Sequence, residues 1–136
     1  MSLFSKRVLL FSLLMLASCA ISFSNIQGQT TVRITNSLDG NLDLTLHCKS
    51  KEDDLGVKLI HQGAFFEWSF NTFFIEPYGF YCNFRWKNVS TWFVIYDVGR
   101  DARRCKLCYW IIKQDGPCLV GPPNAGYEPI CYKWYK

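Results

Sequence analysis

The chain has 136 residues, a formal net charge of +4 and an aromatic content of 17 %. This length suits one small domain and not two, once a leader segment has been set aside. The charge balance is too mild to imply nucleic acid or an anionic membrane surface as a partner. The bulk properties therefore favour a single globular domain rich in aromatic side chains.

The first residues have the pattern of an export signal. Lys6 and Arg7 form a short positive region, and an apolar run and small residues follow. The run is shorter than the roughly 20 apolar residues of a membrane span, so we expect a signal peptide over residues 1–20, with cleavage as late as residue 24. A bacterial lipoprotein site at Cys19 is the alternative. Export predicts a secreted, extracellular protein of 116 residues and charge +2, without stable membrane insertion.

The mature region consists of short segments in which apolar and polar residues alternate. The clearest covers residues 41–49, where Leu42, Leu44, Leu46 and Cys48 share one face. We expect strands at 32–34, 41–49, 57–60, 64–70, 80–86, 92–96 and 106–113, with turns between them. About seven short strands at this spacing are typical of an antiparallel sandwich or barrel, so the predicted fold is all-β.

Two further features concern the core and the end of the chain. The inward faces of the expected strands carry an aromatic set that we interpret as core: Phe66, Trp68, Phe70, Phe80, Phe84 and Trp86. From residue 114 the chain becomes rich in glycine and proline, which predicts loops. We therefore expect a domain over residues 29–115 and a cysteine-containing aromatic extension over residues 116–136.

Six cysteines remain after the signal, and an even number in a small exported chain predicts a disulfide framework. They are Cys48, Cys82, Cys105, Cys108, Cys118 and Cys131. We favour a bridge between Cys118 and Cys131, whose loop is worth about 3 kcal/mol in the chain-entropy model. The sequence does not choose among the connectivities of the other four. Asn88-Val89-Ser90 is an N-glycosylation acceptor, so we expect a glycan on Asn88.

A series of short motifs resembles the plant self-incompatibility protein S1 family, also called S-protein homologues. The motifs are Val32-Arg33-Ile34-Thr35-Asn36, His47-Cys48-Lys49-Ser50 to Asp54-Leu55-Gly56, Trp68-Ser69-Phe70, Tyr81-Cys82 with Trp86, Phe93 to Asp97, and Cys105 with Cys108 and Trp110. The resemblance covers residues 32 to 115 and implies a small, secreted, disulfide-bonded antiparallel β-sandwich. Founding members act as stigma-side ligands read by a pollen receptor, and the family is not known for enzymes. Cys118 and Cys131 look like additions to it.

The polar connector over residues 99–104 is the best candidate for a recognition site. Loops projected from a rigid scaffold carry function more often than strands do. Arginine side chains form paired contacts with carboxylates. We therefore predict that Arg100, Asp101, Arg103 and Arg104 contact a cell-surface receptor protein. An ordinary charged surface loop is the alternative interpretation.

Catalytic and metal chemistry have weaker signals. His47 and His61 are the only histidines, and with Lys58 they suggest a secreted ribonuclease as the alternative function. His47, however, is expected on the outer face of a strand. Cys105 and Cys108 have the spacing of a redox dithiol but open a strand pattern, which favours a structural disulfide. The acidic run at 51–54 lacks calcium-ligand spacing, so we expect no metal and no cofactor.

Overall fold

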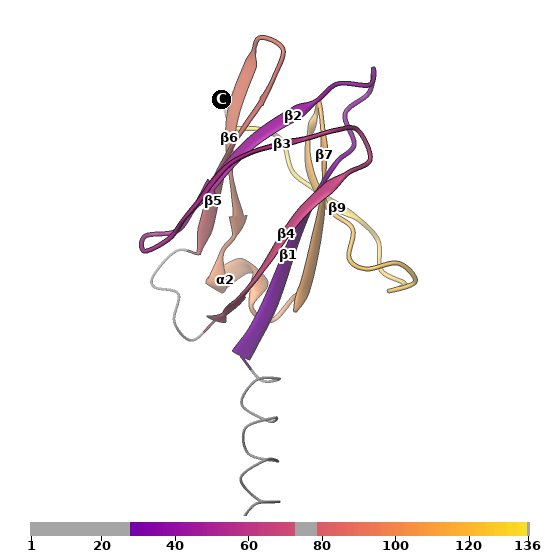
Figure 1. The fold of residues 1–136 in the computed structure, drawn as a ribbon. Coiled ribbons are helices and arrows are strands. Elements are labelled where there is room, and N and C mark those ends of the chain that lie inside the picture. Colours follow the sequence, from indigo (N-terminus) through magenta and orange to yellow (C-terminus); the bar gives the residue numbers. More distant parts are fainter. Residues whose placement is uncertain (1–27, 73–78, 136) are drawn as a thin grey trace, which may run out of the picture.

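The computed structural model describes residues 28–72 and 79–135. The predicted signal peptide and Cys19 lie outside these residues. Within them, nine strands form two facing sheets, and one short helix lies between β6 and β7 (Figure 1). They are β1 (Gln29–Asn36), β2 (Leu44–Lys49), β3 (Asp54–Ile60), β4 (Phe65–Asn71), β5 (Phe80–Trp86), β6 (Val89–Tyr96), α2 (Val98–Asp101), β7 (Leu107–Lys113), β8 (Gly116–Leu119) and β9 (Ile130–Cys131).

The strands are arranged as a β-sandwich, which confirms the predicted fold. The first sheet has the order β4-β1-β7-β8-β9 and the second has the order β3-β2-β5-β6. All neighbouring pairs are antiparallel except β1 and β7, which are parallel. The antiparallel prediction missed this pair because β1 and β7 are separated by five other strands. No hairpin between them fixes their relative direction.

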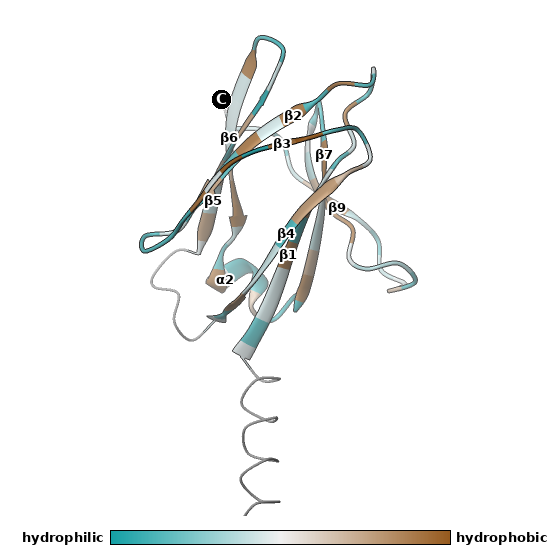
Figure 2. Ribbon diagram, viewed as in Figure 1, coloured by the Kyte–Doolittle hydropathy of each residue, from teal (hydrophilic) through white to brown (hydrophobic). Residues whose placement is uncertain are grey.

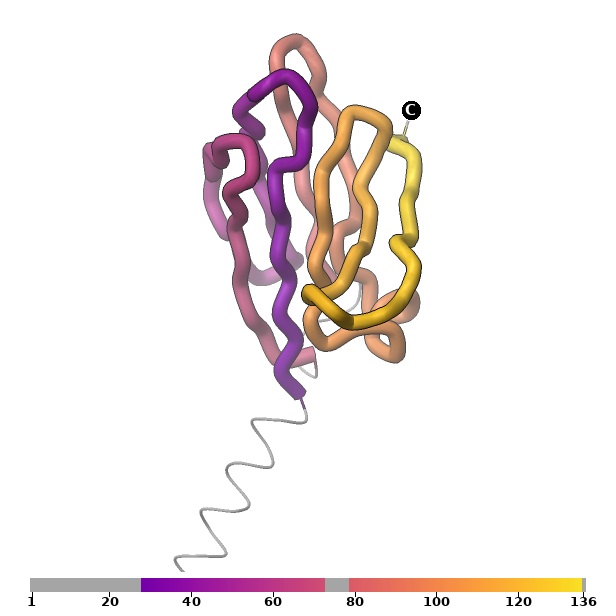
Figure 3. The backbone as a smooth tube through the Cα atoms, turned by 90° about the vertical axis from the view of Figure 1, so that its right-hand side faces the viewer, coloured from indigo at the N-terminus to yellow at the C-terminus, as the bar shows by residue number. Residues whose placement is uncertain are grey.

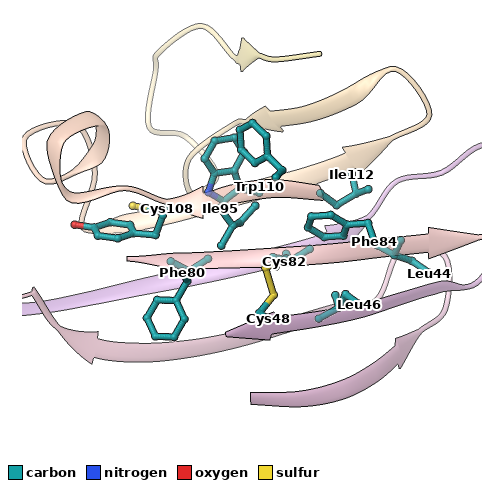
Figure 4. Packing of buried hydrophobic residues seen from close by; sticks show 14 of the residues in the cluster. Leu44, Leu46, Cys48, Phe80, Cys82, Phe84, Ile95, Cys108, Trp110 and Ile112 are labelled. Carbon is teal, nitrogen blue, oxygen red and sulfur yellow. A yellow bond between two sulfur atoms is a disulfide. The ribbon is translucent and has the colours of Figure 1, made fainter. Parts of the chain in front are cut away.

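Alternation along the strands places the core between the sheets. On β2 and β5 every second residue is buried, and Leu46, Cys48, Cys82 and Phe84 have no or almost no exposed surface. Hydrophobic segments follow the strands, whereas the turns are more hydrophilic (Figure 2). Side chains of both sheets meet in the interior, where Trp110 and Ile112 of β7 lie across from Phe84 (Figure 4). A period of two residues therefore accounts for most of the core.

The predicted aromatic core is confirmed on β5 and only partly on β4. Phe80, Phe84 and Trp86 are buried. Three β4 residues are half-buried and pack against the core cluster: Phe66, Trp68 and Phe70. The difference arises because β4 is an edge strand of its sheet, so one side of its inner face has no neighbouring strand.

The C-terminal segment is a part of the sandwich. β8 and β9 extend the first sheet, so the expected boundary after residue 115 falls inside the β7–β8 hairpin. Figure 3 shows the yellow C-terminal segment alongside this hairpin. Tyr132 packs on Phe93 of β6, with 5.5 Å between ring centroids. A side chain at Gly116 would overlap the carbonyl oxygen of Tyr132, so glycine there permits the close approach.

Three disulfides brace the structure. The favoured Cys118–Cys131 bridge is present and joins β8 to β9. Cys48–Cys82 joins β2 to β5 inside the core (Figure 4). Cys105–Cys108 ties the end of the connector to the start of β7 at Cys108, and both of its residues are buried. Among the six residues only Cys131 is exposed, so the Cys105–Cys108 pair lacks the accessible thiol of a redox centre.

Asn36 ties together the loops at one end of the sandwich. Its fully buried side-chain amide donates to the carbonyl oxygens of Leu42 (2.7 Å) and Ile60 (3.0 Å) and accepts a hydrogen bond from the backbone N–H of Leu38 (3.0 Å). The sequence predicted only a turn at this position. The amide instead bonds backbone groups of the loops at this end of the sandwich, among them the carbonyl oxygen of Ile60 at the end of β3.

Candidate recognition surface

The connector between β6 and β7 begins with a single helical turn. Asp97 is the N-cap of α2, and its carboxylate accepts a hydrogen bond from the backbone N–H of Arg100 at 3.1 Å. An aspartate is well suited to this position because the first N–H groups of a helix have no partner within the helix. The turn places Arg100 and Asp101 next to each other at the base of the sandwich.

Arg100 and Asp101 form an interior ion pair. Asp101 is fully buried, and its two carboxylate oxygens accept from Arg100 Nε (2.8 Å) and Nη2 (2.7 Å). The same carboxylate accepts from the Asp97 N–H, and Arg100 Nη2 also donates to the Val94 carbonyl oxygen. Burial alone would lower the pKa of Arg100, but the hydrogen bonds and charge of Asp101 raise this pKa above its ordinary value.

The Arg100 guanidinium also contacts three aromatic rings. It lies 5.1 Å from the ring centroid of Phe93, 5.3 Å from that of Trp110 and 5.4 Å from that of Tyr132. A cation at this distance over aromatic faces is attracted to them. Through these contacts the connector is joined to both sheets and to the C-terminal segment.

Of the four predicted receptor contacts, two therefore face the interior and two are exposed. Arg100 and Asp101 face inward, which corrects their assignment as partner-facing residues. The sequence pattern suggested an exposed loop because all four residues are charged, but a fully paired carboxylate and guanidinium can be buried. Arg103 and Arg104 are exposed, together with Lys106, which the sequence analysis did not single out.

The exposed arginines stand on a rigid base. The backbone N–H groups of Arg104 and Cys105 both donate to the Asp101 carbonyl oxygen, at 2.8 and 3.0 Å. The Cys105–Cys108 disulfide closes the segment that follows. Arg104 Nη1 donates to the Tyr132 hydroxyl at 2.7 Å, whereas Arg103 has no hydrogen bond or ion pair within the described part of the chain. Exposed cations thus project from a backbone with little freedom.

The two histidines do not form a common site. His47 Nε2 contacts Asp54 Oδ1 at 2.6 Å on the outer face of β2, and His61 Nδ1 contacts Asp43 Oδ1 at 2.7 Å in the turn after β3. Asp43 lies beside His61 and four residues before His47, so the imidazoles are separated by about 13 Å along the strand direction. Lys58 points instead at the ring of Phe66. An acid and a base at this separation do not reach the same phosphodiester.

The acidic run before β3 forms hydrogen bonds within the local turn. Asp54 Oδ1 accepts from the Gly56 N–H at 2.8 Å, and the Asp53 N–H donates to Ser50 Oγ at 3.0 Å. Over residues 28–72 and 79–135, His, Cys, Asp and Glu side chains form no group of three or more that suits a metal ion. The same residues contain no helix long and apolar enough to cross a membrane.

The pKa of Asp54 gives a test of this turn. The Gly56 N–H and then His47 lower it below its ordinary value of 3.8. A lowered pKa stabilises the fold above the unfolded-state pKa, and this contribution is lost as pH falls through the folded-state pKa. In His47→Ala we expect an NMR titration to give an Asp54 pKa that rises but stays below the ordinary value, because the hydrogen bond from the Gly56 N–H, the largest single cause, remains. A return to the ordinary value would contradict this assignment.

The predicted glycosylation site is sterically open. Asn88 is exposed in the two-residue turn between β5 and β6. A glycan at this turn projects away from the sandwich, and its presence stays a prediction.

A family model and the sequences of known relatives match this chain over the same region. The family described as plant self-incompatibility protein S1 matches residues 31–134. S-protein homolog 3 of Arabidopsis thaliana is 41 % identical over 107 residues, which cover 76 % of this chain and 71 % of the relative. S-protein homolog 29 of the same plant is 37 % identical over 106 residues and 78 % of each chain.

The fold is also similar to that of a solved structure. It belongs to the self-incompatibility protein homologues, described as small, highly stable, secreted proteins from plants. The TM-score is 0.56 at 19 % identity, over 80 % of this chain and 96 % of the other. At this identity the likeness concerns the fold alone. The family match extends through β8 and β9, the segment that the sequence analysis had set apart as an extension.

Proposed function

Because the chain belongs to the plant self-incompatibility protein S1 family, we propose that it is a secreted, non-enzymatic ligand that binds a receptor protein on plant cells. The N-terminal signal pattern and the disulfide bonds support an extracellular location. The relatives named above carry family names without a stated activity. The particular role therefore has to be argued from the surface of this chain.

The main support for the proposal is that Arg103 and Arg104 are exposed on a connector whose backbone is held by hydrogen bonds and a disulfide. Both side chains are exposed, while the two nearby acids are occupied, Asp97 as the helix cap and Asp101 by Arg100. Their charge is thus available to carboxylates of a partner, with which arginine forms strong two-point contacts. Since the supporting backbone is already fixed, binding orders few additional groups.

Labelled mature protein tests this proposal on protoplasts from floral and vegetative tissue. We expect saturable binding that unlabelled protein competes away and that brief protease treatment of the cells removes. Binding that does not saturate, or that survives the protease, would argue against a receptor protein. An RNA-cleavage assay addresses the alternative: we expect no cleavage, and cleavage abolished in His47→Ala would support a ribonuclease.

A further inference from the structure

A second surface lies on the outer side of the sheet β3-β2-β5-β6, on the face turned away from the core. We call it the outer aromatic face and define it by Tyr81, Asn83, Arg85, Trp92 and Lys49. Tyr81 is 41 % exposed and Trp92 is 51 % exposed. The solvent face of an antiparallel sheet is normally polar. Large exposed aromatic residues at such positions therefore call for an explanation.

Strand register brings the two aromatic residues together. Trp92 of β6 lies opposite Asn83 of β5, and Tyr81 precedes Asn83 by two residues on the same face. The Tyr81 and Trp92 rings are 6.1 Å apart with an interplanar angle of 37°. Asn83 Nδ2 donates to Ser90 Oγ and to the Thr91 carbonyl oxygen, which fixes the amide between the strands. The result is an ordered aromatic platform beside a fixed amide.

Positive charge lies at both ends of this platform. Lys49 of β2 pairs with Tyr81, and Arg85 follows Tyr81 by four residues on the same face, about 13 Å away along the strand. Neither cation forms an ion pair within the part of the chain that the structure describes. Asp54 lies opposite Lys49 in the register and is bound by His47, and the charge of Lys49 also contributes to lowering the Asp54 pKa. The face therefore suits a ligand with spaced negative charges.

The layout favours a sugar polymer over a protein or a second copy of this chain. The other exposed apolar residues of this sheet face, Val57 and Leu59, are separated from the aromatic pair by Thr45 and His47 of β2. A protein interface has a continuous apolar centre with few charges. Here the aromatic pair is small and surrounded by polar groups. This arrangement matches a pyranose ring, whose C–H face packs on an aromatic ring while its hydroxyl groups bond to amides.

We propose that the outer aromatic face binds an anionic polysaccharide whose sugars carry carboxylates, a polyuronate. Tyr81 and Trp92 pack against sugar rings, and Arg85 and Lys49 pair with carboxylates at the two ends. Asn83 Oδ1 accepts a hydrogen bond from a sugar hydroxyl, because both N–H groups of this amide are donated to β6. The site is separate from the connector arginines. The proposal does not depend on the receptor binding described above.

Affinity electrophoresis and calorimetry with polygalacturonate test the proposal. We expect binding that is lost when the same polymer is fully methyl-esterified, because esterification removes the charge and keeps the sugar. Trp92→Ala and Arg85→Gln should each weaken binding by about tenfold, and Trp92→Tyr should retain it. Unfolding curves show whether each variant remains folded.

Matched controls distinguish binding at this site from nonspecific electrostatic or hydrophobic binding. Tyr127→Ala removes an equally exposed aromatic residue outside this sheet, and Arg103→Gln removes a connector charge. Both should leave polygalacturonate binding unchanged. The proposal is overturned by an absence of binding, by equal binding of the esterified polymer, or by an equal loss in Arg103→Gln. Displacement by an oligonucleotide at equal concentration, or a dimer that Trp92→Ala dissociates, would assign the face to another occupant.

Discussion

Asp101→Ala is expected to lower the free energy of unfolding by about 3–5 kcal/mol, because it leaves the Arg100 guanidinium, whose side chain is only 19 % exposed, without its partner. The substitution removes both hydrogen bonds from Arg100 and the acceptor for the Asp97 N–H. It also loosens the cap of α2. Equilibrium denaturation monitored by tryptophan fluorescence measures the effect.

Glu67→Ala is the matched control. It breaks a pair of similar length, 2.8 Å between Arg33 Nε and Glu67 Oε2, that is partly exposed on the first sheet. We expect a loss of about 1 kcal/mol or less from this exposed pair. In Arg100→Met/Asp101→Leu both charges of the pair are replaced by apolar groups, and much of the lost stability should return. Equal losses in Asp101→Ala and Glu67→Ala would contradict the structural role assigned to the buried pair.

Removal of the Cys48–Cys82 disulfide is expected to have a comparable effect. This bridge joins residues 34 positions apart, compared with 3 for Cys105–Cys108. In the chain-entropy model the longer loop is worth about 4 kcal/mol and the shorter about 2 kcal/mol. Cys48→Ala/Cys82→Ala also removes two buried sulfur atoms from the core, which adds a packing loss.

The comparison uses denaturant titration of the two double variants. We expect Cys48→Ala/Cys82→Ala to lose more stability than Cys105→Ala/Cys108→Ala. The reverse order would show that loop length and core burial do not control the contribution of these bridges. Mass spectrometry of the unsubstituted protein first establishes that all six cysteines are oxidised.

The alternation of apolar and polar residues predicted the central strands and their buried faces. The alternation in residues 41–49 and 80–86 placed Leu46, Cys48, Cys82 and Phe84 on buried faces, and the structure agrees. The glycine-rich tail was predicted as an appendage because β8 and β9 are too short to show alternation. Their place in the sheet depends on a bridge and on packing against β6.

Tertiary contacts determine which charged residues of the connector face inward and which are exposed. Arg100 and Arg103 are the same residue type in one short polar segment, and nothing local distinguishes them. Arg100 turns inward because Asp101, the Val94 carbonyl oxygen and the aromatic rings of Phe93, Trp110 and Tyr132 surround it. The role of Asn36 could not be predicted for a similar reason, since its amide bonds to Ile60, 24 residues away.

The central claim is that Arg103 and Arg104 recognise a partner while Arg100 and Asp101 only support them. The most direct test is the dissociation constant for cell-surface binding of Arg103→Ala/Arg104→Ala, compared with Lys113→Gln as a charge control at the exposed end of β7. We predict that the connector variant binds at least about tenfold more weakly with an unchanged unfolding curve, and that Lys113→Gln binds as the unsubstituted protein does. Unchanged binding by the connector variant would contradict the claim.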